Sequence, residues 1–148
     1  MQERFKTFTL LINKISRSIR KIKTGEMAEL ELKSTHVSCI YYLYTMQSLT
    51  AKELCEVCEE DKAAISRSIE YLEKGGYIET VDKDNKKYKR PLELTEKGAI
   101  IGKQLSERID SILEQASAGI SDEERAIMYR ALAVISENLH KISSEYEN

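Results

Sequence analysis

The feature that most constrains the fold is the order of patterns within residues 50–95. A short amphipathic segment, TAKELCEVCEE, precedes a longer one, DKAAISRSIEYLEK, and a pair of glycines follows it. Two extended segments come next, YIETVDK and KYKRPLELT, on either side of a basic turn. Two helices joined by a tight turn and followed by a hairpin are typical of a winged helix-turn-helix. The sequence therefore predicts a mainly α fold with a small β-hairpin wing.

Helix boundaries in this block can be predicted from capping chemistry. Thr50 with Glu53 forms a capping box that begins the first helix, and Asp61 is a suitable N-cap for the second. Gly75 is expected to end the second helix in a left-handed conformation. The segment 34–46, which is apolar on more than one side, predicts a central helix ahead of the pair.

The hairpin that follows has a predicted register. Val81 and Tyr88 are expected to face each other across a tight turn at 84–85. Residues 92–94 alternate between apolar and charged side chains, as in a half-buried strand. Pro91 lacks a backbone donor, which favours an edge strand.

Long amphipathic helices are predicted at both ends of the chain. Thr95 is expected to cap a helix that follows the hairpin, and Ser121 with Glu124 forms a capping box for the last helix. Each end of the chain has an apolar seam at helical spacing. The seams can pack on each other within one chain, or on a second copy, and we expect a two-fold homodimer because proteins with this fold commonly bind DNA as dimers. The expected interface residues are Phe5, Phe8, Ile12, Ile15, Ile19, Ile135, Leu139 and Ile142.

Charge and composition narrow the class of protein. The net charge is −2, yet basic residues concentrate in 1–24 and in the hairpin, and acidic residues concentrate in the C-terminal segment. The hairpin bases, expected to contact DNA phosphates or else to form an ordinary charged turn, are Lys83, Lys86, Lys87, Lys89 and Arg90. The basic residues of 1–24 are explained equally well as DNA contacts and as the solvent-exposed face of their helix. We find no apolar run that could span a membrane and no secretion signal, so a cytoplasmic protein without a membrane partner is expected.

Catalytic and metal-binding patterns are not found in the sequence. The two histidines lie far apart, and no glycine-rich phosphate loop or paired acidic motif is present, so we expect neither an enzyme nor a bound cofactor. Cys55-x-x-Cys58 lacks a second ligand pair for zinc, and no metal site is predicted. The thiols of Cys55 and Cys58 are interpreted mainly as buried core groups. Redox sensing is the alternative, and it requires an exposed thiol of low pKa.

The block LTAKELCEVCEEDKAAISRSIEYLEKGGYIE, followed by a basic turn and LELTEKG, resembles the MarR family of bacterial winged-helix regulators. The resemblance covers nearly the whole chain, because the long end helices match that family's dimerisation helices. It implies one MarR-like chain, 1–148, in three parts. These are an N-terminal dimerisation helix and linker (1–33), a DNA-binding lobe (34–97) and C-terminal dimerisation helices (98–148).

Two departures from the family pattern affect the expected DNA contacts. The turn before the recognition helix usually has glycine and then an apolar residue, whereas this chain has Glu59 and Glu60. The family wing commonly has Asp-x-Arg, and those places hold Lys86 and Tyr88 here. The wing is basic but lacks the arginine that enters the minor groove.

The second helix of the pair is the expected recognition helix. Apolar side chains on one face should pack inward and leave Lys62, Ala63, Ser66 and Arg67 facing outward. Arg67 can donate two hydrogen bonds to guanine, and Lys62 suits a phosphate. The alternative is a solvated helix face in which these charges pair with Glu70 or Glu73.

These observations predict a homodimeric, sequence-specific transcription regulator that binds a double-stranded DNA operator. The resemblance to the family favours a repressor over an activator. An alternative is a winged-helix module for protein–protein assembly without DNA, and another is a thiol-gated, redox-sensing regulator. The resemblance also implies a small amphipathic or phenolic ligand, although the same side chains suit the core and its rim. The candidate lining residues are His36, Tyr41, Tyr42, Tyr44 and Tyr77.

Overall fold

The computed structural model describes residues 2–81 and 90–147, without the side chain of Gln2, and divides the chain into two compact units, 1–108 and 109–148. The first unit contains α1 (Gln2–Glu26), a 3-10 turn η1 (Ala28–Leu30), α2 (Ser34–Met46), α3 (Ala51–Cys58), α4 (Lys62–Lys74), β1 (Ile78–Thr80), β2 (Leu92–Leu94) and the first part of α5 (Glu96–Ala116). The second unit contains the end of α5 and α6 (Asp122–Ser144). In the residues that the structure describes, six α-helices and one antiparallel strand pair confirm the predicted winged helix-turn-helix class.

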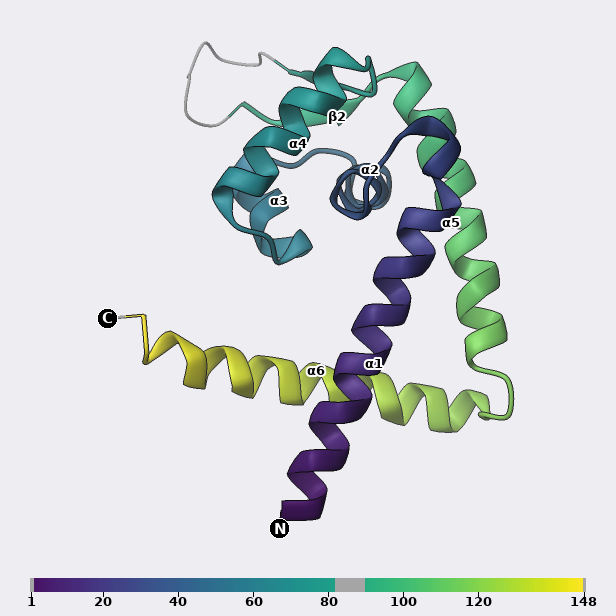
Figure 1. Cartoon of the computed structure of the whole chain (residues 1–148), viewed down its shortest axis with the longest axis vertical. Coiled ribbons are helices and arrows are strands. Elements are labelled where there is room, and N and C mark those ends of the chain that lie inside the picture. Colours follow the sequence, from purple (N-terminus) through teal and green to yellow (C-terminus); the bar gives the residue numbers. More distant parts are fainter. Residues whose placement is uncertain (1, 82–89, 148) are drawn as a thin grey trace. The chain divides into compact units, whose positions relative to one another are not determined.

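α2 is the centre of the first unit. Figure 1 views it end-on, with α3 and α4 packed on one side of it. Its Val37, Cys39, Ile40 and Leu43 are at most 1% exposed, because the helix is apolar on several sides and meets neighbours on each. The surrounding helices contribute one or two fully buried side chains each, namely Leu54, Ile65, Leu72 and Leu105.

Capping chemistry positions α3 and α4 as predicted. The Thr50 hydroxyl accepts a hydrogen bond from the backbone N–H of Glu53, whose carboxylate accepts one from the N–H of Thr50. Asp61 accepts a hydrogen bond from the N–H of Ala64 at 2.7 Å. These caps satisfy backbone donors that the first turn of a helix leaves without partners.

The glycine pair ends α4, but with the roles of the two residues exchanged. Gly75 was predicted in the left-handed region, whereas it has φ −75° and Gly76 has φ +75°. α4 therefore continues one residue further before the chain reverses, and Gly76 is the residue whose missing Cβ the turn requires. Gly25 lies inside α1, which continues to Glu26.

The hairpin register differs from the prediction. Ile78 pairs with Leu94, and the N–H of Val81 donates to the carbonyl of Pro91 at 2.9 Å. The prediction that Val81 faces Tyr88 is therefore wrong, because the observed register aligns Val81 with Pro91. Tyr88 and the expected turn at 84–85 lie outside the described residues.

Pro91 favoured an edge position for the second strand, but β2 has backbone partners on both sides. On the side away from β1, Leu92 exchanges two backbone hydrogen bonds with Leu49, at 2.8 and 3.2 Å. The segment between α2 and α3 thus pairs with the wing. This bridge ties the base of the hairpin to the helical part of the lobe.

A glycine lets α5 approach the lobe closely. The hydroxyl of Thr95 accepts a hydrogen bond from the N–H of Gly98 at 3.1 Å and donates to the carbonyl of Gly76, so this residue caps α5 and binds the turn after α4. A Cβ at position 98 would overlap the carbonyl oxygen of Tyr77. The threonine and the glycine of the segment LELTEKG therefore stand three residues apart because one caps α5 and the other lets that helix pack against the backbone of Tyr77.

The second unit is dominated by α6. Its first turn has the predicted capping box, in which Ser121 accepts from the N–H of Glu124 at 3.1 Å. No residue of α6 is buried in this single chain. In the described part of the chain, no helix is both long and apolar enough to cross a membrane.

Candidate nucleic-acid interface

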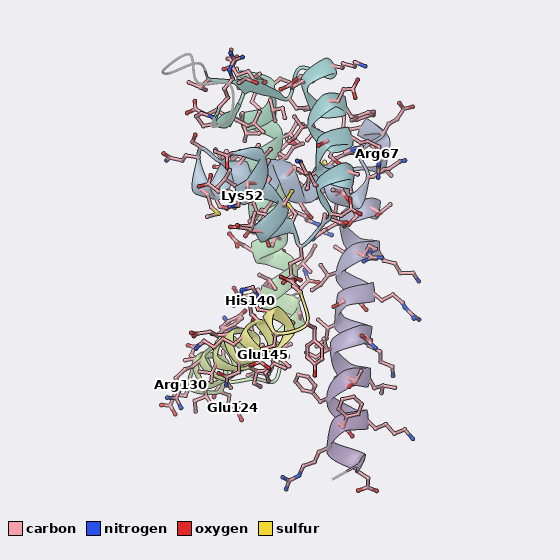
Figure 2. All side chains as sticks on the ribbon, turned by 90° about the vertical axis from the view of Figure 1, so that its left-hand side faces the viewer. Lys52, Arg67, Glu124, Arg130, His140 and Glu145 are labelled. Atoms are coloured by element: carbon pink, nitrogen blue, oxygen red, sulfur yellow. The ribbon has the colours of Figure 1, made fainter. Side chains whose placement is uncertain are left out.

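α4 has one buried face and one open face. Ile65, Ser68 and Leu72 are at most 5% exposed against the core of the lobe. The four residues predicted to contact DNA are all exposed, and they lie in the first two turns of the helix: Lys62, Ala63, Ser66 and Arg67. Figure 2 labels Arg67 where it leaves this helix. Helical periodicity therefore brings the predicted recognition residues together on one surface.

The two glutamates of α4 that lie nearest to this surface have other partners. Glu70 pairs with Lys74 at 2.8 Å, which lowers the pKa of the Glu70 carboxyl through the hydrogen bond and charge of that lysine. Glu73 accepts a hydrogen bond from the hydroxyl of Thr80 at 3.2 Å. Within the described residues, neither glutamate forms an ion pair with Arg67.

A hollow of about 360 Å³ adjoins Arg67. It lies between α4 and the segment that leads into α2, and its lining residues are Glu31, Lys33, Thr35, His36, Ala64, Arg67, Ser68 and Tyr71. The hollow combines two cationic side chains, one carboxylate and two aromatic rings. The aromatic rings suit a ligand with an apolar or aromatic body, and the two cations suit an anionic group on the side away from Glu31.

The aromatic wall of this hollow is built by two rings from different helices. His36 stacks on Tyr71 with ring centroids 4.3 Å apart and planes inclined by 1°. The Tyr71 hydroxyl donates to the carbonyl of Glu31 at 3.0 Å, and the Nδ1 atom of His36 accepts from the N–H of Lys33 at 3.0 Å. Burial, and secondly the charge of Lys33, lower the pKa of His36, so its ring favours the neutral state.

Lys33, Thr35 and Tyr71 were not identified from the sequence. Tyr71 lies four residues after Arg67, one turn along the same helix, and this spacing is a usable signal. Lys33 and Thr35 come from a distant segment, and only the packing of α2 on α4 brings them to this surface.

The turn between α3 and α4 places a large side chain where glycine is favoured. Glu59 has φ 50° and ψ 41°, in the left-handed region. An L-residue there costs roughly 1–2 kcal/mol relative to the right-handed conformation. The conformation explains why glycine is the usual residue at this position, and Glu59 retains the turn geometry despite the substitution.

The wing is described only at its base. Arg90 is exposed, whereas Lys83, Lys86, Lys87 and Lys89 lie outside the described residues. At the base of the wing, β1 packs against α4 of the same lobe.

The five side chains suggested as a ligand pocket are found in several places. His36 lines the hollow beside Arg67, and Tyr41 and Tyr42 form an edge-to-face pair with centroids 5.3 Å apart. Tyr44 packs where Gly102 of α5 leaves room. Tyr77 is buried beneath the ammonium of Lys97, at 4.3 Å. The rings thus act largely as packing groups, and His36 is the one that reaches the hollow.

The predicted dimerisation seams of α1 and α6 are open to solvent. Their exposure ranges from 37% for Ile12 and Ile135 to 74% for Phe5, with the other predicted residues Phe8, Ile15, Ile19, Leu139 and Ile142 between these values. Isolated exposed apolar side chains are ordinary, whereas α1 and α6 each expose several of them at helical spacing.

The cysteines do not form a metal site in the described residues, where no group of three or more ligating side chains comes together. Cys39 is fully buried. Cys55 and Cys58, which the sequence suggested as buried core thiols, are half-buried against the core.

Comparisons with known proteins agree with this architecture. The sequence model of the MarR family matches residues 30–87. An uncharacterized HTH-type transcriptional regulator of Bacillus subtilis (strain 168), YybA, is 27% identical over 131 residues, which are 88% of this chain and 87% of the relative.

Two solved structures are similar over most of their length. The MarR family regulator NMB1585 from Neisseria meningitidis has a TM-score of 0.80 at 24% identity, over 96% of this chain and 97% of its own. A putative MarR family transcriptional regulator from Listeria monocytogenes, solved in complex with a 26-mer DNA, has a TM-score of 0.80 at 26% identity, over 86% and 85%. With the capped helix pair, the hairpin and the open face of α4 on one lobe, these similarities lead to one conclusion: the chain has the winged helix-turn-helix fold, and its residues 30–87 match the MarR family.

Proposed function

We propose that this protein is a homodimeric, sequence-specific DNA-binding transcription regulator that acts as a repressor. The observation that carries the proposal is the exposure of Lys62, Ala63, Ser66 and Arg67 together on one face of α4, while the opposite face is anchored in the core. Insertion into a major groove requires a rigid helix whose basic side chains are exposed and available to the DNA.

Each of these four side chains suits a different contact. The guanidinium of Arg67 can donate to guanine O6 and N7, and the Ser66 hydroxyl can reach a base edge or a phosphate. The methyl group of Ala63 suits the methyl group of thymine. Lys62 lies in the first turn, where a phosphate contact would orient the helix without selecting sequence.

A second copy of the chain would complete the DNA-binding geometry. The open seams of α1 and α6 support this, since a dimer would bury apolar side chains that a single chain leaves exposed. In such a dimer the two α4 helices would reach successive major grooves, about 34 Å apart. The basic wing, of which Arg90 is described, would contact the phosphate backbone beside each groove.

Release by a small aromatic ligand is part of the proposal. The hollow beside Arg67 supports it, because a phenol or aromatic carboxylate seated against His36 and Tyr71 would occupy space next to a recognition residue. A panel of such compounds should displace duplex from the parent protein, and displacement should weaken in Tyr71→Ala. Tyr77→Phe, which alters a ring elsewhere in the lobe, is the matched control.

The main test is a binding selection from a pool of random duplexes, followed by variants on the selected operator. Arg67→Ala should cost about 1–3 kcal/mol and relax one base position in each half-site. Lys62→Ala should weaken all duplexes alike. Lys74→Ala removes the same charge from the far end of α4, where it pairs with Glu70, and should leave affinity unchanged.

A salt titration separates DNA binding from a protein–protein role. A DNA reader loses affinity steeply with salt, by nearly one unit of log–log slope for each phosphate contact. Full operator affinity in Arg67→Ala would contradict the assignment of α4. Failure of the parent to select any duplex would favour an assembly module instead.

A further inference from the structure

The hollow beside Arg67 is lined by a buried side chain whose hydroxyl is available to a ligand. Ser68 is 5% exposed and lies on the core-facing side of α4, yet it borders the hollow. Within the described residues, its hydroxyl neither donates nor accepts a side-chain hydrogen bond. Buried polar groups are normally hydrogen-bonded. A group that enters the hollow would therefore supply the partner that this hydroxyl lacks in the single chain.

The N-terminus of α2 borders the same hollow. The helix begins at Ser34 with Lys33 as its N-cap residue, and Lys33 and Thr35 both line the hollow. A lysine side chain has no acceptor, so it cannot satisfy the N–H groups of the first turn. In the described part of the chain, the N–H groups of Ser34 and Thr35 have no backbone acceptor. Such N–H groups, together with the helix dipole, favour an anion at this end of the helix.

The charges around the hollow also favour an anion. Lys33 and Arg67 are both exposed, and neither forms an ion pair among the described residues. Glu31 is the opposing charge. Its backbone carbonyl is held by the Tyr71 hydroxyl at 3.0 Å, while its side chain is exposed and can turn toward solvent.

We propose that this hollow seats one phosphate of the operator backbone, held by the Lys33 ammonium, the Thr35 and Ser68 hydroxyls and the N-terminus of α2. The proposal rests on the proposed insertion of α4 into a major groove, because phosphate backbones border that groove on both sides of the helix. The volume of about 360 Å³ leaves room for the sugar that adjoins the phosphate. A phosphate held here would fix the position of Arg67 over the bases without itself reading sequence.

A phosphate seat also changes how a ligand in the hollow would act. An aromatic carboxylate would compete with the DNA phosphate for Lys33 and for the N-terminus of α2. Release would then follow from direct exclusion of the DNA, and it would need no change in the spacing of the two α4 helices of a dimer.

Methylphosphonate substitution tests the seat, because it removes the charge of one DNA phosphate at a time. On the selected operator, the parent protein should lose affinity at several phosphates, including one in each half-site that lies in the hollow. At that position the loss should be largely absent in Lys33→Gln and in Ser68→Ala, since each variant lacks a group that the phosphate would contact. The losses at all other positions should stay the same.

The unmodified operator gives a second measurement. Lys33→Gln should weaken binding about tenfold, the lower end for a hydrogen bond to a charged group, and reduce the log–log salt slope by nearly one unit. Thr35→Val and Ser68→Ala remove neutral hydroxyls and should weaken binding less, with an unchanged slope. Glu31→Gln removes the opposing charge and should tighten binding. The matched control is Lys74→Gln, at the far end of α4 in an ion pair, which should change neither affinity nor slope.

Inorganic phosphate distinguishes a DNA seat from a site for a free anion. The rest of the duplex adds affinity that a free ion lacks, so phosphate at equal ionic strength should displace the operator little more than chloride does. Marked displacement by phosphate, with the same methylphosphonate losses in parent and variants, would indicate a free-anion site and overturn the proposal.

Other results would also contradict the seat. These are full operator affinity in Lys33→Gln, or methylphosphonate losses that disappear at different positions in Lys33→Gln and Ser68→Ala. With a parent that binds DNA, such results refute the seat and leave the proposed function intact. A parent that selects no duplex would refute the proposed function and the seat together.

Discussion

α4 and α6 have similar apolar periodicity, but the apolar face is buried in α4 and exposed in α6. In α4, Ile65 and Leu72 are 1% and 0% exposed, because α2, α3 and β1 surround one face of the helix. In α6, Ile135 and Leu139 are 37% and 52% exposed, and no residue is buried. Both helices begin with a side-chain cap of the same geometry.

This difference shows that an amphipathic pattern predicts a buried face without identifying what buries it. Burying one large apolar side chain contributes roughly 1.5–3 kcal/mol, whether the neighbours belong to the same chain or to another. In the lobe the neighbours are local, so its stability should not depend on protein concentration. For α1 and α6 we propose that a second copy supplies them, so their contribution should depend on concentration.

The largest expected effect comes from charging both open seams. Ile15→Glu with Leu139→Glu would place unpaired charges in the proposed interface, and a two-fold axis counts each change twice. The dimer should dissociate and operator binding should collapse, while the lobe keeps much of its helical circular dichroism. Light scattering measures the mass. A parent protein that is monomeric at micromolar concentration, or a double variant that stays dimeric, would contradict the proposed interface.

A buried leucine of the lobe gives the contrasting case. Leu54→Ala removes a side chain that is 0% exposed, and should cost about 2–5 kcal/mol of unfolding free energy. Urea unfolding followed by circular dichroism should give this loss at every protein concentration. The matched variant, Leu139→Ala, should give a loss that varies with concentration. The same concentration dependence for both variants would remove the distinction between the two regions.

Variants of two helix caps distinguish the effect of helix stability on DNA binding from the effect of helix orientation. Asp61→Ala and Ser121→Ala each remove a side chain that accepts a backbone hydrogen bond in the first turn, and each should cost about 1 kcal/mol. Operator affinity, measured well below the unfolding midpoint, should fall more in Asp61→Ala, since that cap orients α4. Equal affinity losses would indicate that both variants act through general stability.

The smallest effect is a pH dependence confined to the lobe. Burial, then the charge of Lys33, lower the pKa of His36 in the folded state, so the unfolded chain takes up this proton first as the pH falls. Stability should therefore decrease as the pH falls below the unfolded histidine value of about 6.5, and level off below the folded value. His36→Asn, which keeps an acceptor for the N–H of Lys33, should flatten this part of the profile. His140→Asn, on exposed α6, is the control and should leave it unchanged.

Local chemistry made much of the lobe predictable. The caps at Thr50, Asp61 and Ser121 were identified correctly because each depends on residues three positions apart. The same locality gave the open face of α4, since one anchored residue determines where its helical neighbours point. The left-handed residue was assigned to the wrong glycine of the pair, because both can adopt that conformation and the choice depends on how far α4 continues.

Contacts between distant segments were the source of the errors and omissions. The hairpin register depends on Leu92 bonding to Leu49, and the expected Val81–Tyr88 pair took no account of that bridge. The hollow beside Arg67 needs Lys33 and Thr35 from the segment before α2.

The sequence by itself determined where each helix begins, which face of each is apolar, and that two helices and a hairpin form a winged lobe. These properties follow from caps, glycines and side-chain periodicity, all of which act within a few residues. The tertiary structure decided which apolar faces are covered and which side chains surround Arg67. Those outcomes depend on the packing of segments that lie far apart in the chain, and local periodicity carries no information about such distances.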